Sequence, residues 1–290
     1  MKKILAVSLV VLTFLFGLGL MFYPDISSWH NARIQRGLIS GFEQEVAALD
    51  EEYINEHIRR ARDYNDSLSG FNIRDPFVEG SGAVLPPAYY METLNVGGLM
   101  AHIEIPVIEV RLPVFHTTTM EILDRGVGHI EGTSFPVGGL GTHAVLTGHS
   151  GLAHARMFTD LEEIVYGDLF FITVLNYKLA YEVDQIRTVL PHEIELLRIN
   201  DEEDFVTLIT CTPYTVNTHR LLIRGRRVPY EPGMIEEILP REIQSTDWRL
   251  VIIVGIIAIF VIFFLAYKVR EKKKEKQRSG HPKWQYWSGT

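Results

Sequence analysis

The middle of the chain contains a series of short runs of β-branched, aromatic and aliphatic residues, and this pattern limits its possible folds more than any other feature. Gly, Pro, Asn and Asp separate the runs, as they separate strands. Eight such runs within about 130 residues predict a mainly β protein built on a closed β-barrel. The predicted strands are 99–105, 107–115, 143–148, 168–175, 179–184, 186–190, 205–211 and 219–228.

A helix is predicted before the barrel. Apolar residues recur near the helical period between residues 28 and 65, with charged residues on the opposite face. Ser27 and Ser28 are suitable N-caps for it. Gly and Pro are too frequent in residues 66–90 for regular elements, so a long surface loop, often a functional feature, is expected there. A short helix is expected at 154–163.

Two apolar runs near the ends of the chain, 4–22 and 250–267, have the length of a membrane-spanning helix. Lysines precede the first run and a basic tail follows the second. Because positive flanks stay on the cytoplasmic side, both termini are predicted to be cytoplasmic and residues 23–249 to lie outside. The alternative for the first run is a signal peptide, but no small-x-small cleavage site follows it.

The charge of the middle region argues against one class of partner. The whole chain has a formal net charge of −8, from 28 basic and 36 acidic residues. The two tails, 1–22 and 268–290, hold 10 of the basic and 2 of the acidic residues, which leaves the middle with a net charge of −16. A domain this acidic is not expected to bind nucleic acid.

Cys211 is the only cysteine, so the chain cannot form an internal disulfide. A lone cysteine in an exported domain is either an incidental buried residue or a retained reactive thiol. Cys211 ends one β-run, Pro213 interrupts the strand, and a new strand begins near His219. In such a hairpin, position 211 lies opposite 219 or 220, so Arg220 can lie beside the thiol.

A cation beside a thiol favours the nucleophilic thiolate. The guanidinium of Arg220 could also stabilise an oxyanion or hold a substrate backbone. A Cys–Arg pair across a hairpin is also a common structural feature, so the pair alone does not establish catalysis.

His149 is the candidate proton carrier. It ends another β-run, between Gly148 and Ser150-Gly151, where the glycines leave room around the imidazole. A thiol nucleophile needs such an acid to protonate a leaving amine, although a loop hydrogen bond is the plainer role. His143 and His154 lie nearby, but the spacings of six and five fit no metal-ligand pattern, and neither a metal nor another cofactor is expected.

Three motifs together resemble the sortase family. The segment Thr-Leu-Ile-Thr-Cys ending at Cys211 matches the family's Thr-Leu-x-Thr-Cys signature, and Thr-Gly-His149 and Arg220 follow the family's order and spacing. The resemblance covers residues 95–230 and implies the sortase barrel. It also implies that Cys211 attacks the threonyl carbonyl of an LPxTG-like sorting signal. His149 would protonate the departing glycine amine and later deprotonate the incoming amine, while Arg220 would position the substrate and the oxyanion.

Two further features resemble class C sortases, the pilin polymerases. Asp75-Pro76-Phe77 is similar to the class C lid, in which the acid faces the active-site Arg and the aromatic ring covers the Cys; an ordinary Asp-Pro turn is the alternative. A second, C-terminal anchor is also common in that class. The resemblance implies a cysteine transpeptidase that joins pilin subunits, its partners, through a lysine amine without a cofactor.

Two other functions stay open. One is a sortase that attaches surface proteins to peptidoglycan, and the other is a non-catalytic, membrane-anchored β-barrel adhesin or scaffold. The segment from Leu239 to Ile243 begins like a sorting signal, but it lacks the Thr and Gly that a sortase substrate needs at its last two positions. The chain is therefore interpreted as the enzyme.

These features predict six parts, with the catalytic domain outside a Gram-positive cell membrane and both termini in the cytoplasm. They are an N-terminal transmembrane anchor (1–22), an extracellular helix and lid loop (23–94), a sortase β-barrel (95–232), a linker (233–249), a transmembrane helix (250–267) and a basic cytoplasmic tail (268–290).

Overall fold

The structure is a computed structural model that describes residues 2–68, 88–193, 195–241, 255–257 and 268–270. The chain divides into two compact units, Met1–Ile243 and Gln244–Thr290. The described part of the second unit consists of two short helical pieces, so the fold below is that of the first unit.

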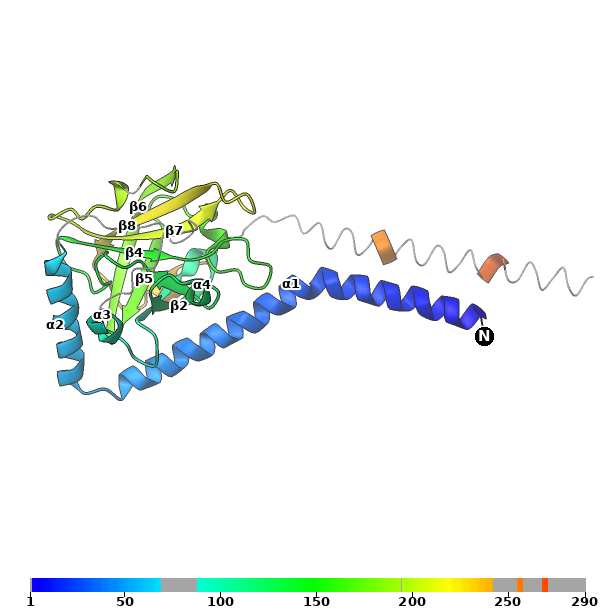
Figure 1. The fold of residues 1–290 in the computed structure, drawn as a ribbon, viewed down its shortest axis with the longest axis horizontal. Coiled ribbons are helices and arrows are strands. Elements are labelled where there is room, and N and C mark those ends of the chain that lie inside the picture. The colour runs from blue at the N-terminus through cyan, green and yellow to red at the C-terminus, as the bar shows by residue number, and fades with distance from the viewer. Residues whose placement is uncertain (1, 69–87, 194, 242–254, 258–267, 271–290) are drawn as a thin grey trace, which may run out of the picture. The chain divides into compact units, whose positions relative to one another are not determined.

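An eight-stranded closed barrel forms the centre of the first unit, as predicted (Figure 1). The strands follow one another around the barrel in the order β1-β2-β3-β4-β7-β8-β6-β5, and β5 closes it by pairing with β1. The pairs β2–β3 and β4–β7 are parallel and the others are antiparallel. The strands are β1 (Ala101–Ile105), β2 (Val110–His116), β3 (Val127–His129), β4 (Thr142–Thr147), β5 (Leu169–Val174), β6 (Tyr177–Val189), β7 (Asp204–Thr212) and β8 (His219–Val228).

Two strand predictions need correction. The runs 179–184 and 186–190 belong to one strand, β6, whose register with β8 shifts between Val183 and Gln185. Such a bulge interrupts the alternation of side chains without ending the strand, which explains why the sequence suggested two strands. Strand β3 was missed because it has three residues, one of them Gly128.

The predicted single helix over 28–65 is two helices, α1 (Lys2–Ala47) and α2 (Glu51–Ser67). Ser27 and Ser28 lie inside α1 and cap nothing. The break comes at Asp50, whose side chain accepts a hydrogen bond from the Tyr53 backbone N–H at 2.7 Å and so caps α2. The helix expected at 154–163 is a shorter 3₁₀ turn, η2 (Thr159–Glu163). The remaining short elements are α3 (Ala88–Glu92), α4 (Met120–Leu123), α5 (Met234–Glu237), η1 (Pro106–Ile108) and η3 (Glu195–Leu197).

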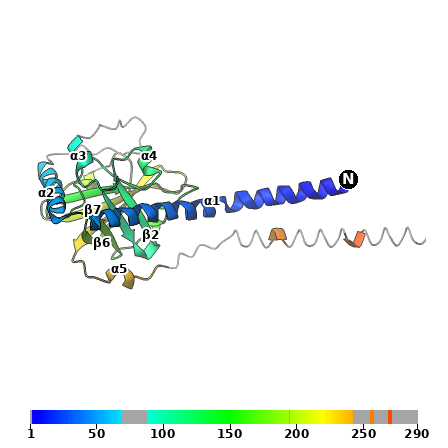
Figure 2. The same ribbon diagram turned by 90° about the horizontal axis from the view of Figure 1, so that it is seen from below.

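Both long helices pack on the barrel. Helix α1 runs along β2 (Figure 2), and its buried face includes Ile39, Phe42 and Val46. Helix α2 is fixed at its end by Asn65, whose amide accepts from the Phe135 N–H at 2.7 Å and donates to the Phe135 carbonyl at 3.2 Å.

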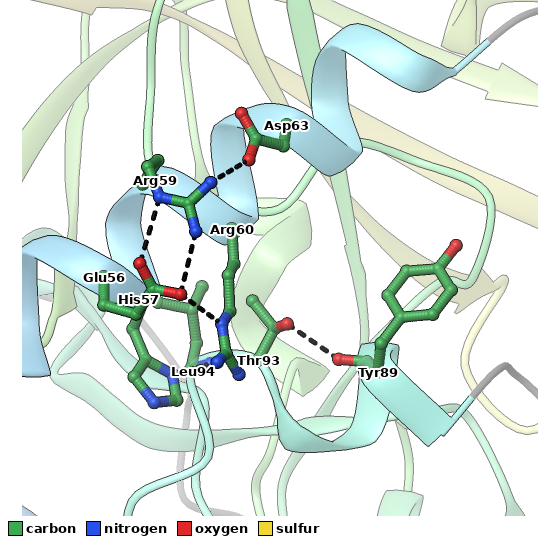
Figure 3. A network of polar contacts seen from close by, with 8 residues as sticks. All are labelled: Glu56, His57, Arg59, Arg60, Asp63, Tyr89, Thr93 and Leu94. Atoms are coloured by element: carbon green, nitrogen blue, oxygen red, sulfur yellow. Dashed lines mark hydrogen bonds and ion pairs between the residues drawn. The ribbon is translucent and has the colours of Figure 1, made fainter.

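Helix α2 is also joined to the segment that follows α3 (Figure 3). His57 Nδ1 accepts a hydrogen bond from the Leu94 N–H at 3.0 Å, and the Tyr53 ring stacks on the imidazole. On the exposed side of α2, Glu56 pairs with Arg59 and Arg60 at 2.8 Å. Exposed pairs of this kind add little stability, so the buried bonds of His57 and Asn65 fix α2 in place.

Strand β7 lies at the centre of the scaffold. It pairs with β4 on one side and β8 on the other, and it is buried along its whole length. One face joins the large core inside the barrel, which includes Val206, Leu208 and Ile223, and the other packs in a second cluster around Ile209 and Leu222. A strand that is buried on both faces reads as a nearly continuous apolar run, as residues 205–211 do.

The structure does not support the expected transmembrane helices. Residues 4–22 form the beginning of α1, yet none of the helices in the described part of the chain has both the length and the apolar character needed to cross a membrane. Of the second run, 250–267, only residues 255–257 belong to the described part.

Candidate active site

The thiol of Cys211 and the guanidinium of Arg220 come from directly paired residues. Cys211 lies near the end of β7, and its partner in the antiparallel register is Arg220, the second residue of β8. Directly opposed residues of such a pair point to the same face of a sheet, so the two side chains are neighbours, as the hairpin spacing predicts. Both are buried: Cys211 is 6% exposed and Arg220 is 5% exposed.

The hairpin loop itself holds the buried charge of Arg220. The Nη1 group donates hydrogen bonds to the carbonyls of Asn217 at 3.1 Å and His219 at 3.0 Å. The loop closes through the N–H groups of Val216 and Asn217, which both donate to the Pro213 carbonyl at 3.0 Å. A guanidinium has five donors in a planar fork, so it can bind several acceptors at once.

His149 follows the end of β4, the other strand that pairs with β7, and lies close to Cys211. Strand β4 runs parallel to β7 with Thr147 paired to Ile209, and the Gly148 N–H continues the ladder by donating to the Ile209 carbonyl at 3.1 Å. The Ser150 hydroxyl donates to the carbonyl of Cys211 itself at 2.5 Å. Residues 148–150 therefore run beside 209–211, and His149 lies next to Cys211.

The surroundings of His149 hold its pKa below the ordinary value, chiefly because the imidazole is half-buried. The negative charge of Asp124 opposes this shift and raises the pKa, while nearby His154 lowers it. A histidine with a lowered pKa is mainly neutral at pH 7 and can accept a proton there. A thiol, an imidazole and a guanidinium at three adjacent strand ends form the set of groups that nucleophilic acyl transfer needs.

Comparisons with known proteins agree with this geometry. A family model described as the sortase domain matches residues 103–228. Among solved structures, sortase C-1 from Streptococcus pneumoniae is 46% identical with a TM-score of 0.64, over 67% of this chain and 98% of that one. Sortase C1 of GBS pilus island 1 is 42% identical with a TM-score of 0.62, over 68% of this chain and 94% of that one. The chain belongs to the sortase family.

The resemblance predicted from the motifs is thus confirmed, and the enzyme class of the family is that of cysteine transpeptidases. A curated relative, sortase D of Bacillus subtilis (strain 168), is 26% identical over 140 residues, which are 47% of this chain and 66% of that protein. The match therefore spans just under two thirds of that relative's length.

This sortase contains site features that the sequence did not point to. Asp124, whose charge acts on His149, follows α4, and no motif marks it. The Thr212 hydroxyl donates to the Glu162 carboxylate at 2.5 Å and so ties the end of β7 to η2. Ser150 could have been noticed because it directly follows the predicted proton carrier.

His143 is not part of the site. Its Nδ1–H donates to the Arg198 carbonyl at 2.9 Å, and its Nε2 accepts from the Thr207 hydroxyl at 2.7 Å. Both ring nitrogens are thereby occupied in a fully buried position between β4 and β7. Within the described ranges, no group of three or more His, Cys, Asp or Glu side chains could hold a metal ion.

Two further predictions concern segments outside the barrel. The proposed lid, Asp75-Pro76-Phe77, lies outside the described residues. The described part of the segment that begins like a sorting signal is docked on the folded domain: the Arg241 N–H donates to the Val107 carbonyl at 2.7 Å, and its guanidinium pairs with Asp168 at 2.9 Å. These contacts agree with its interpretation as part of the enzyme.

Proposed function

We propose that this sortase is a transpeptidase that polymerises pilins. It cleaves an LPxTG-like sorting signal between Thr and Gly and joins the threonyl group to a lysine amine of the next pilin. The observation that carries the proposal is the direct pairing of Cys211 with Arg220 at the end of a buried strand, with His149 beside them on the adjacent strand end.

In the first half-reaction, the thiolate of Cys211 attacks the threonyl carbonyl and Arg220 stabilises the resulting oxyanion. The Thr–Gly bond then breaks, the glycine amine leaves with a proton from His149, and a thioester forms. In the second half-reaction a lysine amine attacks the thioester while His149 takes its proton. The new amide forms, the Cys211 thiolate is released and His149 keeps the proton. This restores the thiolate and protonated imidazole that begin the cycle, so the cycle balances without a cofactor.

Pilin subunits are the proposed partners because a similar structure, at 42% identity over 94% of its chain, is by its name the sortase of a pilus island. The acceptor in this proposal is a pilin lysine, whereas an enzyme that anchors proteins to the wall would use an amine of peptidoglycan. Offering both amines in competition distinguishes the two: preference for the wall amine would overturn the pilin assignment.

The proposal places the catalytic domain on the outer face of a Gram-positive cell membrane, with both termini in the cytoplasm. The apolar runs 4–22 and 250–267 and their basic flanks support this arrangement. Fusions of a reporter that is active only in the cytoplasm to each terminus test it, and an inactive reporter at either end would contradict it.

The proposal also includes a lid, on the resemblance of Asp75-Pro76-Phe77 to that of class C enzymes. Asp75 would neutralise Arg220 in the empty enzyme, and Phe77 would keep water from Cys211. Substrate entry would then require the lid to open.

The decisive experiment incubates the enzyme with a sorting-signal peptide and a pilin acceptor, and follows the acyl-enzyme by mass spectrometry. We expect an adduct on Cys211 and a joined product, both absent in Cys211→Ala. Joining of pilins by the Cys211→Ala protein would show that the mechanism is wrong.

A further inference from the structure

The N-terminal helix α1 contacts the barrel close to the loop that carries His149. Its buried residues Gln35 and Ile39 are four apart, so they share one helix face. Asn31, which is half-buried, lies four residues earlier on the same face. This face is apolar at Ile39, Phe42 and Val46 and changes to amide side chains at Gln35 and Asn31.

Both amides bond to backbone far away in the sequence. Asn31 Nδ2 donates to the His154 carbonyl at 2.6 Å. Gln35 Nε2 donates to the Arg125 carbonyl at 3.2 Å and lies 3.3 Å from the Met157 sulfur. Gln35 is only 7% exposed, so its amide depends on these protein partners in place of water.

Each of the segments that the two amides contact is linked to His149. Residues 154–157 belong to the loop that begins at His149 and returns to it, since the Phe158 N–H donates to the His149 carbonyl at 3.0 Å. The other segment contains Asp124, the acid whose charge acts on the His149 imidazole, followed by Arg125. Gln35 contacts both segments, and Asn31 contacts the first.

We propose that Gln35, assisted by Asn31, is a positioning residue for His149. Helix α1 holds the loop 154–157 and the Asp124–Arg125 turn at a fixed separation, and this fixes the imidazole relative to Cys211. The inference rests on the proton-transfer role proposed for His149. Proton transfer requires donor and acceptor within hydrogen-bond reach, and a displacement of about 1 Å can reduce a rate by about 10²-fold.

The pairing of Cys211 with Arg220 does not depend on α1, because the ladder between β7 and β8 fixes it. Loss of the Gln35 bonds should therefore impair the protonation of the leaving group and leave the nucleophile intact. A substrate whose leaving group needs no proton separates these two effects.

The test compares Gln35→Leu with Gln44→Leu in the full chain solubilised in detergent. Gln44 makes a matched control because it is exposed in the same helix, and among the described residues its amide bonds to Ser40, one turn earlier. Single-turnover acylation of Cys211 is followed by mass spectrometry with two substrates. One is the sorting-signal peptide, with its amine leaving group, and the other is a thioester analogue, whose thiolate leaves unprotonated.

With the peptide, we expect Cys211 to be acylated about 10-fold more slowly in Gln35→Leu than in Gln44→Leu. With the thioester, the acylation rates of the two variants should agree within about twofold. His149→Ala should show the same dependence on the leaving group. Equal rates for the two Leu variants with the peptide, or an equal loss with both substrates, would overturn the positioning role.

A normal peptide rate in His149→Ala would contradict the proposed proton transfer itself, and thereby the inference that depends on it. The absence of an acyl-enzyme in Cys211→Ala is a separate result and would still support Cys211 as the nucleophile. If Gln35→Leu does not fold, Asn31→Ala carries the same comparison, because it removes a single half-buried bond to the His154 carbonyl.

Discussion

The two halves of the candidate site are built differently. Cys211 and Arg220 belong to one hairpin, and the ladder between β7 and β8 sets their separation. His149 lies where β4 has ended, on a loop whose contacts include a bond from Asn31, 123 residues away from its partner His154. Local register thus fixes Cys211 and Arg220, whereas the loop of His149 also depends on distant tertiary contacts.

This difference implies different sensitivities. A hairpin register is secured by many backbone bonds, so single substitutions outside it should leave Cys211 and Arg220 in place. The His149 loop has few such bonds and should respond to changes in the elements that it packs against.

The largest effect is expected within the hairpin. Arg220→Gln should lower kcat/KM by about 10²–10³-fold, because it removes the only side-chain cation paired with Cys211 in the register. Arg220→Lys should restore part of the loss at most, since one ammonium cannot replace a planar fork of donors. Steady-state transpeptidation of the sorting-signal peptide measures both.

Arg226→Gln is the control for this comparison. Arg226 belongs to the same strand, is exposed and pairs with Glu203 at 3.2 Å, so its loss should change the rate by no more than about twofold. An Arg220→Gln enzyme as active as this control would show that the cation does not take part in catalysis.

The next effect concerns the strand that leads to His149. Burial lowers the pKa of His143 from 6.5 to about 4, whereas the carbonyl of Arg198 acts in the opposite direction. In the unfolded chain this histidine takes up a proton near pH 6.5. Its contribution to stability is therefore complete above pH 6.5 and is lost as the pH falls toward 4, by about 2 kcal/mol at pH 5.

Urea unfolding at pH 7 and pH 5 measures this loss. The wild-type free energy of unfolding should fall by about 2 kcal/mol more than that of His143→Gln, which cannot take up the proton. Equal losses in the two proteins would contradict the assignment of His143 as a neutral structural histidine. His129, with a pKa also lowered to about 4, should add a similar loss to both proteins.

The sequence predicted the hairpin half well for a physical reason. Antiparallel partners joined by a short loop can be found by counting residues, and the count from Cys211 led directly to Arg220. The parallel pairing of β4 with β7 cannot be counted in this way, because the two strands are about 60 residues apart. The place of His149 next to Cys211 was therefore available only through the family resemblance.

The residues that contact the His149 loop, such as Gln35, could not be identified from the sequence. Gln35 was one polar residue in a helical pattern, and only the fold shows that its face is buried. The break between α1 and α2 could have been found, since Asp50 followed by Glu51 and Glu52 is a typical helix start. Regular apolar spacing on both sides of Asp50 obscured it.

Gly148→Ala should have a smaller effect, confined to the loop half. A Cβ atom at this position would lie 2.9 Å from the fully buried Phe158 ring, and the Phe158 N–H holds the His149 carbonyl. Displacement of this ring should lower kcat about 10-fold and destabilise the fold by about 1–3 kcal/mol. Kinetics and urea unfolding of the same preparation measure both quantities.

Gly225→Ala provides the opposite case. Its Cβ would clash with the Phe170 ring inside the barrel, where Gly225 pairs with Val206, several residues before Cys211. We expect a larger loss of stability than for Gly148→Ala and an almost unchanged kcat of the folded fraction. If activity followed stability in both variants, the proposed distinction between the two halves would be wrong.

The smallest effect concerns access to the nucleophile. Cys211 is 6% exposed, so a thiol reagent reaches it only when its surroundings open. If Asp75-Pro76-Phe77 acts as a lid, Asp75→Ala and Phe77→Ala should each increase the open population and speed labelling of Cys211 about threefold.

Tyr177→Ala is the control: it also removes a partly exposed aromatic ring, but at the start of β6, away from the end that pairs with Arg220. Labelling rates equal to this control in both variants would remove the lid assignment, while faster labelling in Phe77→Ala alone would assign the cover to the ring and not to the acid.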